Sequence, residues 1–327
     1  MKAAIVPALH GTWEVREVPT PAPGPGQVLM KIKASGLCYT DVHITEGMLP
    51  TRFPRTLGHE PVGEIVALGA GVTTRRVGDR VGVAWIQGSC ERCEWCQRGK
   101  TIFCVEPLVT GITTQGGHAE FMLAQAAATT LIPEGLSYEQ AAPIFCAGYT
   151  VWSGLRLADP KPQERVAVVG IGGLGHLAVQ YAKAAGFTTI AVTHSKDKEK
   201  LIRGLGADEV VADGKALLKA GGADVILGTT NSYASVTDAL KGLRPDGRLV
   251  VMGASGESIP VTGELIFKRG RVLGSMQNGV EFLHEALRYA AEGRVKVIAE
   301  TFPLSEVARA YERVVQGSVR FRAVITN

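Results

Sequence analysis

The spacing of apolar residues changes near residue 148 and divides the chain into regions of different expected structure. Up to residue 147, short alternating apolar runs are separated by glycine- and proline-rich turns such as PAPGPGQ, which is typical of a mainly β, barrel-like domain. From 148 to 280, apolar runs of strand length alternate with segments of helical spacing, which predicts a parallel, doubly wound sheet. The segment 281–327 reads as a helix followed by shorter pieces. We expect it to return to the first domain and leave a cleft between the two.

The clearest local pattern is ERVAVVGIGGLGHLAVQYAKAAG at 164–186. An apolar strand at 166–169 precedes glycines with G-x-G-x-x-G spacing, and apolar residues then recur at helical spacing. Such glycines allow a tight turn and let a pyrophosphate approach the N–H groups of a helix N-terminus. The glycine triple is a weak signal alone, but between a strand and an amphipathic helix it predicts a dinucleotide site. The candidate cofactor-binding residues of this loop are Gly170, Gly172, Gly173, Leu174 and Gly175.

Four of the six cysteines lie in one short stretch, CERCEWCQRGKTIFC. The spacing C-x2-C-x2-C-x7-C lets a loop close four thiolates around Zn²⁺, and a closed four-sulfur shell leaves no position for substrate. Disulfides are the ordinary alternative, and an iron–sulfur cluster also uses four cysteines, although nothing nearby suggests electron transfer. A zinc-ribbon module that binds nucleic acid would need basic flanks. The prediction is a structural zinc lobe at about 88–105 with the ligands Cys90, Cys93, Cys96 and Cys104.

The two remaining cysteines and one histidine form a second, scattered set: Cys38 in GLCYTDVH, His59 in LGHEPVGEIV and Cys146 in IFCAGYTVWSGL. Each alone has an ordinary explanation, because buried cysteine is common as a small hydrophobe and a lone histidine is usually structural. Together they offer two sulfurs and one nitrogen. This is the ligand count of a catalytic zinc with an open fourth position, and alcohol dehydrogenase is a known owner of such a site.

Composition limits the possible partners. The 327 residues are 46% hydrophobic and 20% charged, an ordinary globular balance with room for two domains. The net charge of +4 arises from 35 basic and 31 acidic residues that are interspersed, so we expect no nucleic-acid partner. No apolar stretch approaches the roughly 18 residues of a membrane span, and the N-terminus lacks the features of a signal peptide. We therefore expect a cytoplasmic protein without a membrane partner, in a compartment that favours metal-bound over disulfide-paired cysteines.

Together these motifs resemble the zinc-dependent medium-chain alcohol dehydrogenases, in their microbial, yeast-like and cinnamyl-like branch. The resemblance runs nearly end to end and joins, in the family's order, GLCYTDVH, GHEPVGEIV, GDRVGVAWI, the four-cysteine lobe, GGHAEF, CAGYTVW, GIGGLGH and LRPDGRLVVMG. It implies a GroES-like catalytic domain at 1–147 and a Rossmann domain at 148–280. It also implies an alcohol or aldehyde substrate, two zinc ions per chain (one catalytic and one structural) and a homo-oligomer, either a tetramer or a dimer.

The resemblance assigns roles around the scattered set. Cys38, His59 and Cys146 match the ligands of the catalytic zinc. Asp41 matches a carboxylate that orients the histidine ligand, a role that zinc sites commonly need. Glu60 matches a glutamate that lies behind the metal and can approach it transiently.

The same resemblance assigns the proton path and one cofactor contact. Thr40 resembles the hydroxyl that hydrogen-bonds the bound alcohol, and His43 resembles the far end of a relay that runs through the cofactor ribose to water. Arg322 matches an arginine that binds the cofactor pyrophosphate. Two departures bear on the cofactor: Phe321 stands where a glycine usually precedes this arginine, and Tyr39 stands where relatives often have a basic residue.

A third departure concerns the substrate pocket. Leu49 stands where close yeast-like relatives carry a tryptophan, whereas Trp85 is retained. The resemblance therefore implies a wider cavity and favours primary alcohols and aldehydes that are longer or aromatic. An NADPH-dependent ketone reductase acting on secondary alcohols is the alternative. A zinc-free quinone or enoyl reductase would lack both cysteine sets, and a non-catalytic dinucleotide-binding protein would need neither the relay nor the scattered set.

Cofactor choice is predicted from the end of the strand at 188–193. In NAD-binding versions of such a domain, a carboxylate near this point takes the ribose hydroxyls of the adenosine. Here no acid follows until Asp197, and hydroxyls and a lysine could instead bind a 2′-phosphate. The residues in question are Thr193, His194, Ser195 and Lys196. The expectation is NADP(H) in preference to NAD(H), and the alternative is that this stretch is simply the solvated start of a helix.

Overall fold

The computed structural model describes residues 1–195 and 199–327, which form two compact units. The first unit combines Met1–Cys146 with Val297–Asn327, and the second comprises Ala147–Lys296. The chain therefore returns to the first unit at residue 297 and not, as expected, at residue 281. The reason is that helix α10 (Val280–Ala291) packs against α4 (Ala147–Ala158), where Trp152 Nε1 donates a hydrogen bond of 2.6 Å to Glu285.

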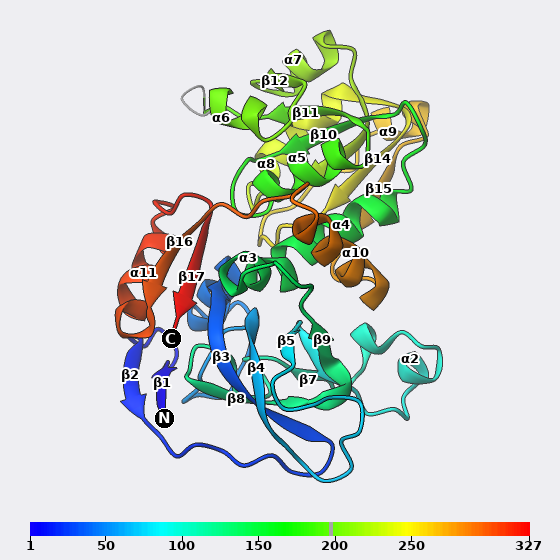
Figure 1. Ribbon diagram of the computed structural model, residues 1–327. Helices are drawn as coiled ribbons and strands as arrows, with labels where there is room; N and C mark the ends of the chain where they lie inside the picture. The colour runs from blue at the N-terminus through cyan, green and yellow to red at the C-terminus, as the bar shows by residue number, and fades with distance from the viewer. Residues whose placement is uncertain (196–198) are drawn as a thin grey trace. The chain divides into compact units, whose positions relative to one another are not determined.

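The first unit is mainly β, as predicted. Its seven-stranded sheet has the order β16-β17-β3-β4-β5-β9, with β8 also paired to β3, and the β16–β17 pair is parallel whereas the other pairs are antiparallel. The strands of this unit are β1 (Lys2–Ile5), β2 (Glu14–Glu17), β3 (Gln27–Leu37), β4 (Pro61–Leu68), β5 (Arg80–Val83), β6 (Ile86–Gly88), β7 (Leu108–Val109), β8 (Phe121–Gln125), β9 (Thr129–Leu131), β16 (Ala299–Pro303) and β17 (Arg322–Thr326). Figure 1 shows the C-terminal β17 beside β3, so the last strand of the chain joins a sheet built mainly from its first half.

Alternation along β3 explains the core of this unit. Val28, Met30 and Ile32 point to one side, where they pack with Ile65 and Val81 of neighbouring strands. Short helices connect or flank the strands: α1 (Tyr39–Thr45), α2 (Glu94–Gln97), η1 (Thr101–Phe103), η2 (Ala126–Ala128), α3 (Tyr138–Ala141), η3 (Ala142–Phe145), η6 (Leu304–Glu306) and α11 (Val307–Val315). The loops between these elements carry the candidate ligands.

The second unit is the predicted doubly wound domain. Its six strands are all parallel and have the order β12-β11-β10-β13-β14-β15. They are β10 (Arg165–Val169), β11 (Thr188–Val192), β12 (Glu209–Val211), β13 (Ala223–Gly228), β14 (Leu243–Val251) and β15 (Arg271–Gly274). The chain starts at β10, runs outward to β12 and then returns to β13. The switch point between β10 and β13 is where ligands bind in such sheets.

Helices alternate with these strands, and several begin at a capping side chain. The helices of this unit are α4, α5 (Gly175–Ala184), α6 (Glu199–Gly204), α7 (Gly214–Lys219), α8 (Tyr233–Ala239), η5 (Leu240–Gly242), α9 (Glu264–Lys268) and α10. Asp213 caps α7 by accepting a hydrogen bond from the N–H of Ala216, and Ser232 caps α8 in the same way. None of the helices in the described part of the chain has the length and apolarity needed to cross a bilayer.

Candidate functional site

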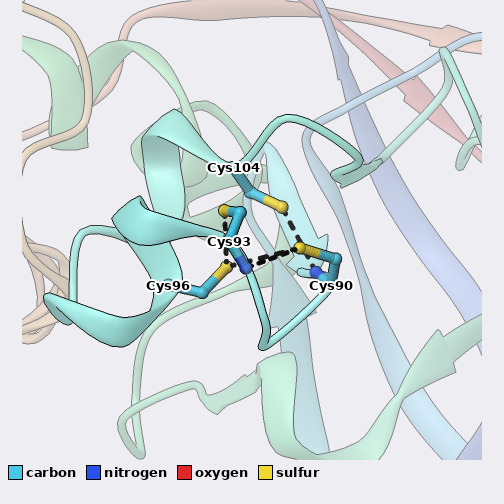
Figure 2. A group of neighbouring side chains, drawn as sticks. All are labelled: Cys90, Cys93, Cys96 and Cys104. Carbon is cyan, nitrogen blue, oxygen red and sulfur yellow. Dashed lines mark hydrogen bonds between the residues drawn. The ribbon is translucent and has the colours of Figure 1, made fainter.

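The four clustered cysteines converge in the segment between β6 and β7. Figure 2 shows their thiols turned toward one another, and the four Sγ atoms lie within 4.8 Å of one another. The Sγ atom of Cys96 is 3.5 Å from that of Cys93 and 4.0 Å from that of Cys90. A tetrahedral zinc with Zn–S bonds of about 2.3 Å would separate its sulfurs by about 3.8 Å. All four cysteines are free in the structure, and their arrangement fits a four-sulfur metal shell.

The backbone around this cluster favours the thiolate form that binds metal. The N–H of Cys90 donates to the Sγ of Cys104 at 3.2 Å, and the N–H of Cys93 donates to the Sγ of Cys90 at 3.4 Å. A backbone hydrogen bond from Cys96 is the largest of the effects that lower the pKa of the Cys93 thiol, to about 6. Against the lowering effect of Ser89, burial and the neighbouring Cys93 and Cys104 raise the pKa of Cys96 to about 11. Thiolates are the ligands of zinc, so the backbone hydrogen bonds to Cys90, Cys93 and Cys104 suit a bound cation.

Three loops of the first unit bring the scattered candidates together. Cys38 follows β3 and caps α1, His59 lies two residues before the start of β4, and Cys146 follows η3. The ligand atoms of these residues and of Glu60 lie within 4.8 Å of one another, and only Cys146 of the four is partly exposed. Residues that are more than 100 positions apart in the sequence thus meet in one buried site.

The chemistry of this second set fits a zinc ion. Neither ring nitrogen of His59 has a hydrogen-bond partner among the described residues, although the ring is buried. The Cys146 thiol lowers the pKa of the Cys38 thiol well below its usual value by a hydrogen bond, and His59 lowers it further. A thiolate, a second thiol and an imidazole without a hydrogen bond form the donor set of a zinc with an open position.

Asp41 holds the two loops that carry Cys38 and His59. One carboxylate oxygen accepts the Cys38 N–H at 2.8 Å, and the other accepts the Gly58 N–H at 3.2 Å and lies 3.6 Å from Nδ1 of His59. Burial opposes ionisation of Asp41, but the neighbouring His59 and His118 hold its pKa well below the usual range. Asp41 therefore lies where a carboxylate orients a histidine ligand. No sequence pattern gave a role to His118, whose Nε2 is 3.9 Å from Asp41.

Glu60 and Arg322 form a buried ion pair behind the ligands. The Arg322 guanidinium contacts Oε1 of Glu60, and both side chains are almost fully buried. Burial raises the pKa of Glu60 to about 7, against the opposing effect of Arg322. The two residues are 262 positions apart in the sequence and meet because β17 pairs with β3.

The predicted pyrophosphate contact of Arg322 stays a prediction, since Arg322 is only 4% exposed and its guanidinium is paired with Glu60. The preceding residue, Phe321, has a φ of 52°, in the left-handed region that favours glycine. The glycine that relatives usually have here would adopt this backbone without strain.

Gly36, which no sequence pattern singled out, makes room for Glu60. A Cβ atom at Gly36 would overlap Oε2 of Glu60. We expect Gly36→Ala to break the Glu60–Arg322 pair and to lower the free energy of unfolding by about 3–5 kcal/mol, as for other buried pairs that lose a partner. Urea unfolding followed by circular dichroism measures this change. The matched control is Gly204→Ala on α6, where a Cβ meets no atom within 4 Å, and an equal loss there would contradict the steric explanation.

The residues of the predicted relay lie on α1. The Thr40 Oγ1 is 3.6 Å from the Sγ of Cys38. His43 lies three residues further on, so the two side chains share one face of the helix. Burial lowers the pKa of His43 and so favours its neutral, proton-accepting form. The Tyr39 ring packs edge-on against His43 at 5.0 Å.

The two residues predicted for the substrate pocket have different surroundings. The Trp85 ring packs edge-on against the His59 ring, with 5.2 Å between the ring centroids. Trp85 therefore lines the metal site directly. Leu49 is partly buried and packs with Phe53 and Ile112 against the apolar cluster that contains Leu57. Its part in substrate choice stays a prediction.

The glycine loop of the second unit connects β10 to α5 as the pattern predicts. Gly170 has a φ of 86°, and a Cβ there would lie 2.6 Å from Cβ of Thr230. A Cβ at Gly175 would overlap the carbonyl oxygen of Gly170, whereas one at Gly172 would meet nothing within 4 Å. Gly170 thus makes the turn, Gly175 lets α5 pack closely, and Gly172 leaves the backbone open to a ligand. These are the three roles expected of the glycines at a pyrophosphate site.

The predicted phosphate-binding stretch follows β11, and its Lys196 lies outside the described residues. The Thr193 N–H donates to Val211 at 2.9 Å, and the Thr193 hydroxyl accepts the Ser195 N–H at 3.2 Å. Asp238 of α8, which no sequence pattern placed here, also lies near this stretch. Its pKa is lowered chiefly by hydrogen bonds from Lys241 and Gly214, and His194 lowers it further. Asp238 is engaged by these two groups.

Comparison with protein-family models identifies both units. Residues 24–134 match the model described as alcohol dehydrogenase GroES-like domain, and residues 173–292 match the model described as zinc-binding dehydrogenase.

Full-length relatives and solved structures agree with these matches. An alcohol dehydrogenase of Geobacillus stearothermophilus is 40% identical over 99% of both chains. A cinnamyl alcohol dehydrogenase of Sorghum bicolor is 31% identical, covers 99% of this chain and 97% of its own, and has a TM-score of 0.91. A thermostable alcohol dehydrogenase of Pyrobaculum aerophilum, solved with cobalt and zinc bound, is 30% identical with a TM-score of 0.90 and covers 100% of this chain and 99% of its own.

Proposed function

Because this chain belongs to the zinc-dependent medium-chain alcohol dehydrogenase family, we propose that it transfers a hydride between a primary alcohol and a nicotinamide cofactor at a zinc held by Cys38, His59 and Cys146. The observation that carries this proposal is the buried set of two sulfurs and an imidazole whose nitrogens have no hydrogen-bond partner among the described residues. A second, structural zinc is proposed for the four clustered cysteines.

The proposed mechanism assigns each residue a separate task. A zinc bound by the three ligands supplies a Lewis acid that lowers the pKa of an alcohol hydroxyl. Asp41 keeps the His59 ring in position, and the Thr40 hydroxyl accepts the proton of the alcohol as it passes its own proton on toward His43. His43, on the same face of α1, passes that proton toward water, which its lowered pKa favours near neutral pH. Reduction of an aldehyde follows the same path in reverse.

The pocket residues support a substrate class. Trp85 packs against His59 and limits the space beside the metal ligands. Leu49, a smaller residue than the tryptophan of yeast-like relatives, supports a preference for longer and aromatic primary alcohols and aldehydes. The second candidate, a reductase of ketones, is distinguished by kcat/KM values for a primary alcohol and its secondary isomer.

We also propose that NADP(H) is preferred over NAD(H), on the ground that Thr193, His194 and Ser195 include no acid. Replacing Thr193 with aspartate is expected to reverse this preference, because the new carboxylate repels a 2′-phosphate and binds ribose hydroxyls instead. The measurement is kcat/KM for both cofactors with one aldehyde, and Thr193→Asn is the uncharged control. A clear NADH preference of the unmodified protein would contradict this cofactor assignment but not the dehydrogenase assignment.

A homo-oligomer is the proposed state of the protein. Strand β15 ends the six-stranded sheet of the second unit, so one of its edges is unpaired in the described chain. Near it in sequence lie some of the most exposed apolar side chains: Val261 is 78% exposed, Ile266 78% and Phe267 90%. Edges and apolar surfaces of this kind are usually covered in solution. A second copy of the chain would cover both.

The proposed activity is tested by nicotinamide absorbance. Purified protein should oxidise an aromatic alcohol in the presence of the cofactor, and a chelator should abolish the reaction in proportion to the zinc removed from the three-ligand site. Absence of alcohol-dependent cofactor reduction across primary and secondary alcohols, in a protein that binds the cofactor, would favour the non-catalytic alternative.

A further inference from the structure

His118 is a buried histidine that the proposed mechanism does not use. It lies between β7 and β8, within GGHAEF, and its side chain is 0% exposed. Its backbone is fixed on both sides, since its N–H donates to Leu57 at 3.1 Å and its carbonyl accepts from Ala4 at 2.8 Å. The ring therefore has a defined place in the interior of the first unit.

The polar contact of the His118 ring is with Asp41. The His118 Nε2 is 3.9 Å from Oδ2 of Asp41, and neither ring nitrogen has a hydrogen-bond partner among the described residues. This distance exceeds hydrogen-bond range, so the contact is between an N–H dipole and a buried carboxylate. Such contacts are poorly screened in an interior. A proton on Nε2 makes this contact favourable, because a carboxylate oxygen can only accept.

A second contact of the ring is with the residue before His59. Gly58 has a φ of 98°, and a Cβ there would lie 2.8 Å from Cγ of His118. The imidazole thus packs directly against the backbone that leads into the histidine ligand. Trp13 lies on another side, with 5.6 Å between the ring centroids. His118 contacts the ligand-bearing loop both through Asp41 and through Gly58.

We propose that His118 is a positioning residue for the metal site, and that its Nε2–H holds Asp41 where the carboxylate fixes the loops of Cys38 and His59. An aromatic hydrocarbon ring would fill the same space without burying two unpartnered nitrogens. The carboxylate facing Nε2 gives a reason for an imidazole instead. This inference rests on the proposed zinc role of Cys38, His59 and Cys146.

The test is the rate at which purified holoenzyme releases zinc to a coloured chelator. We expect His118→Phe to release the zinc of the three-ligand site on the order of tenfold faster, the low end of the effect of residues that support a ligand. Release from the four-cysteine lobe should be unchanged. His118→Gln, which keeps a donor, should release zinc near the unmodified rate. The matched control is Met122→Leu, a volume-conserving change at a nearby buried position on β8.

Melting curves of the zinc-free proteins separate positioning from folding. If the His118 ring only fills space, His118→Phe leaves the rate of zinc release unchanged. That result would overturn the inference. Release from the glutamine variant as fast as from the phenylalanine variant would overturn it too, because the donor would then be irrelevant. His118→Leu provides a second donor-free variant if the phenylalanine variant does not fold. An unmodified protein that binds no metal at the three ligands contradicts the proposed function itself, and this is visible before any variant is compared.

Discussion

Cys146→Ser is expected to reduce turnover to background while the protein keeps its fold. Cys146 is the last residue of the first segment of the first unit, and its sulfur belongs to the three-ligand set. A serine hydroxyl is a poor zinc ligand at neutral pH, so the set loses one of its two sulfurs. The four-cysteine lobe shares no residue with this set and should keep its metal. Turnover and the far-ultraviolet circular dichroism melting curve together measure the two parts of this expectation.

Cys93→Ser is the control for this result. Structural zinc contributes to folding free energy directly, so this variant should lose stability and keep catalytic competence in the fraction that stays folded. Activity retained by Cys146→Ser, or equal loss of stability in both variants, would contradict the division of labour between the two sites.

Thr40→Ala is expected to lower kcat by about 10²–10⁴-fold, the usual effect of removing a positioned acid–base group. The Thr40 hydroxyl lies 3.6 Å from the sulfur of Cys38, beside the proposed position of the alcohol. Thr40→Ser keeps the hydroxyl and should retain most of the activity. The measurement is kcat for both variants with one alcohol at saturating cofactor.

His43→Gln gives the graded comparison for the relay. Water can replace the outer end of a proton path, so the loss should be smaller than for Thr40→Ala, and the pH profile should change. Thr40→Ala with turnover near that of the unmodified protein would mean that the alcohol loses its proton by another route.

Short sequence patterns predicted the two motifs whose residues lie close together in the sequence, the glycine loop and the four-cysteine lobe. The loop from Gly170 to Gly175 was predicted because strand, turn and helix follow one another without interruption. The four-cysteine lobe was predicted because its spacing is contained in one short segment. In both cases the residues that make up the motif are close together in the sequence.

Contacts between distant segments could not be read in this way. The Glu60–Arg322 pair depends on β17 lying beside β3, and the place of His118 depends on how its segment packs against the loop of Gly58. The return of the chain was placed too early for a similar reason. The contact between Trp152 and Glu285 that keeps α10 in the second unit joins residues 133 positions apart.

The zinc content of the purified, active protein tests the central claim most directly. One closed set of four cysteines and one open set of Cys38, His59 and Cys146 predict two zinc ions per chain by elemental analysis. Cys146→Ser should then contain one. A single zinc or none in fully active unmodified protein, or two in the Cys146→Ser variant, would contradict the account.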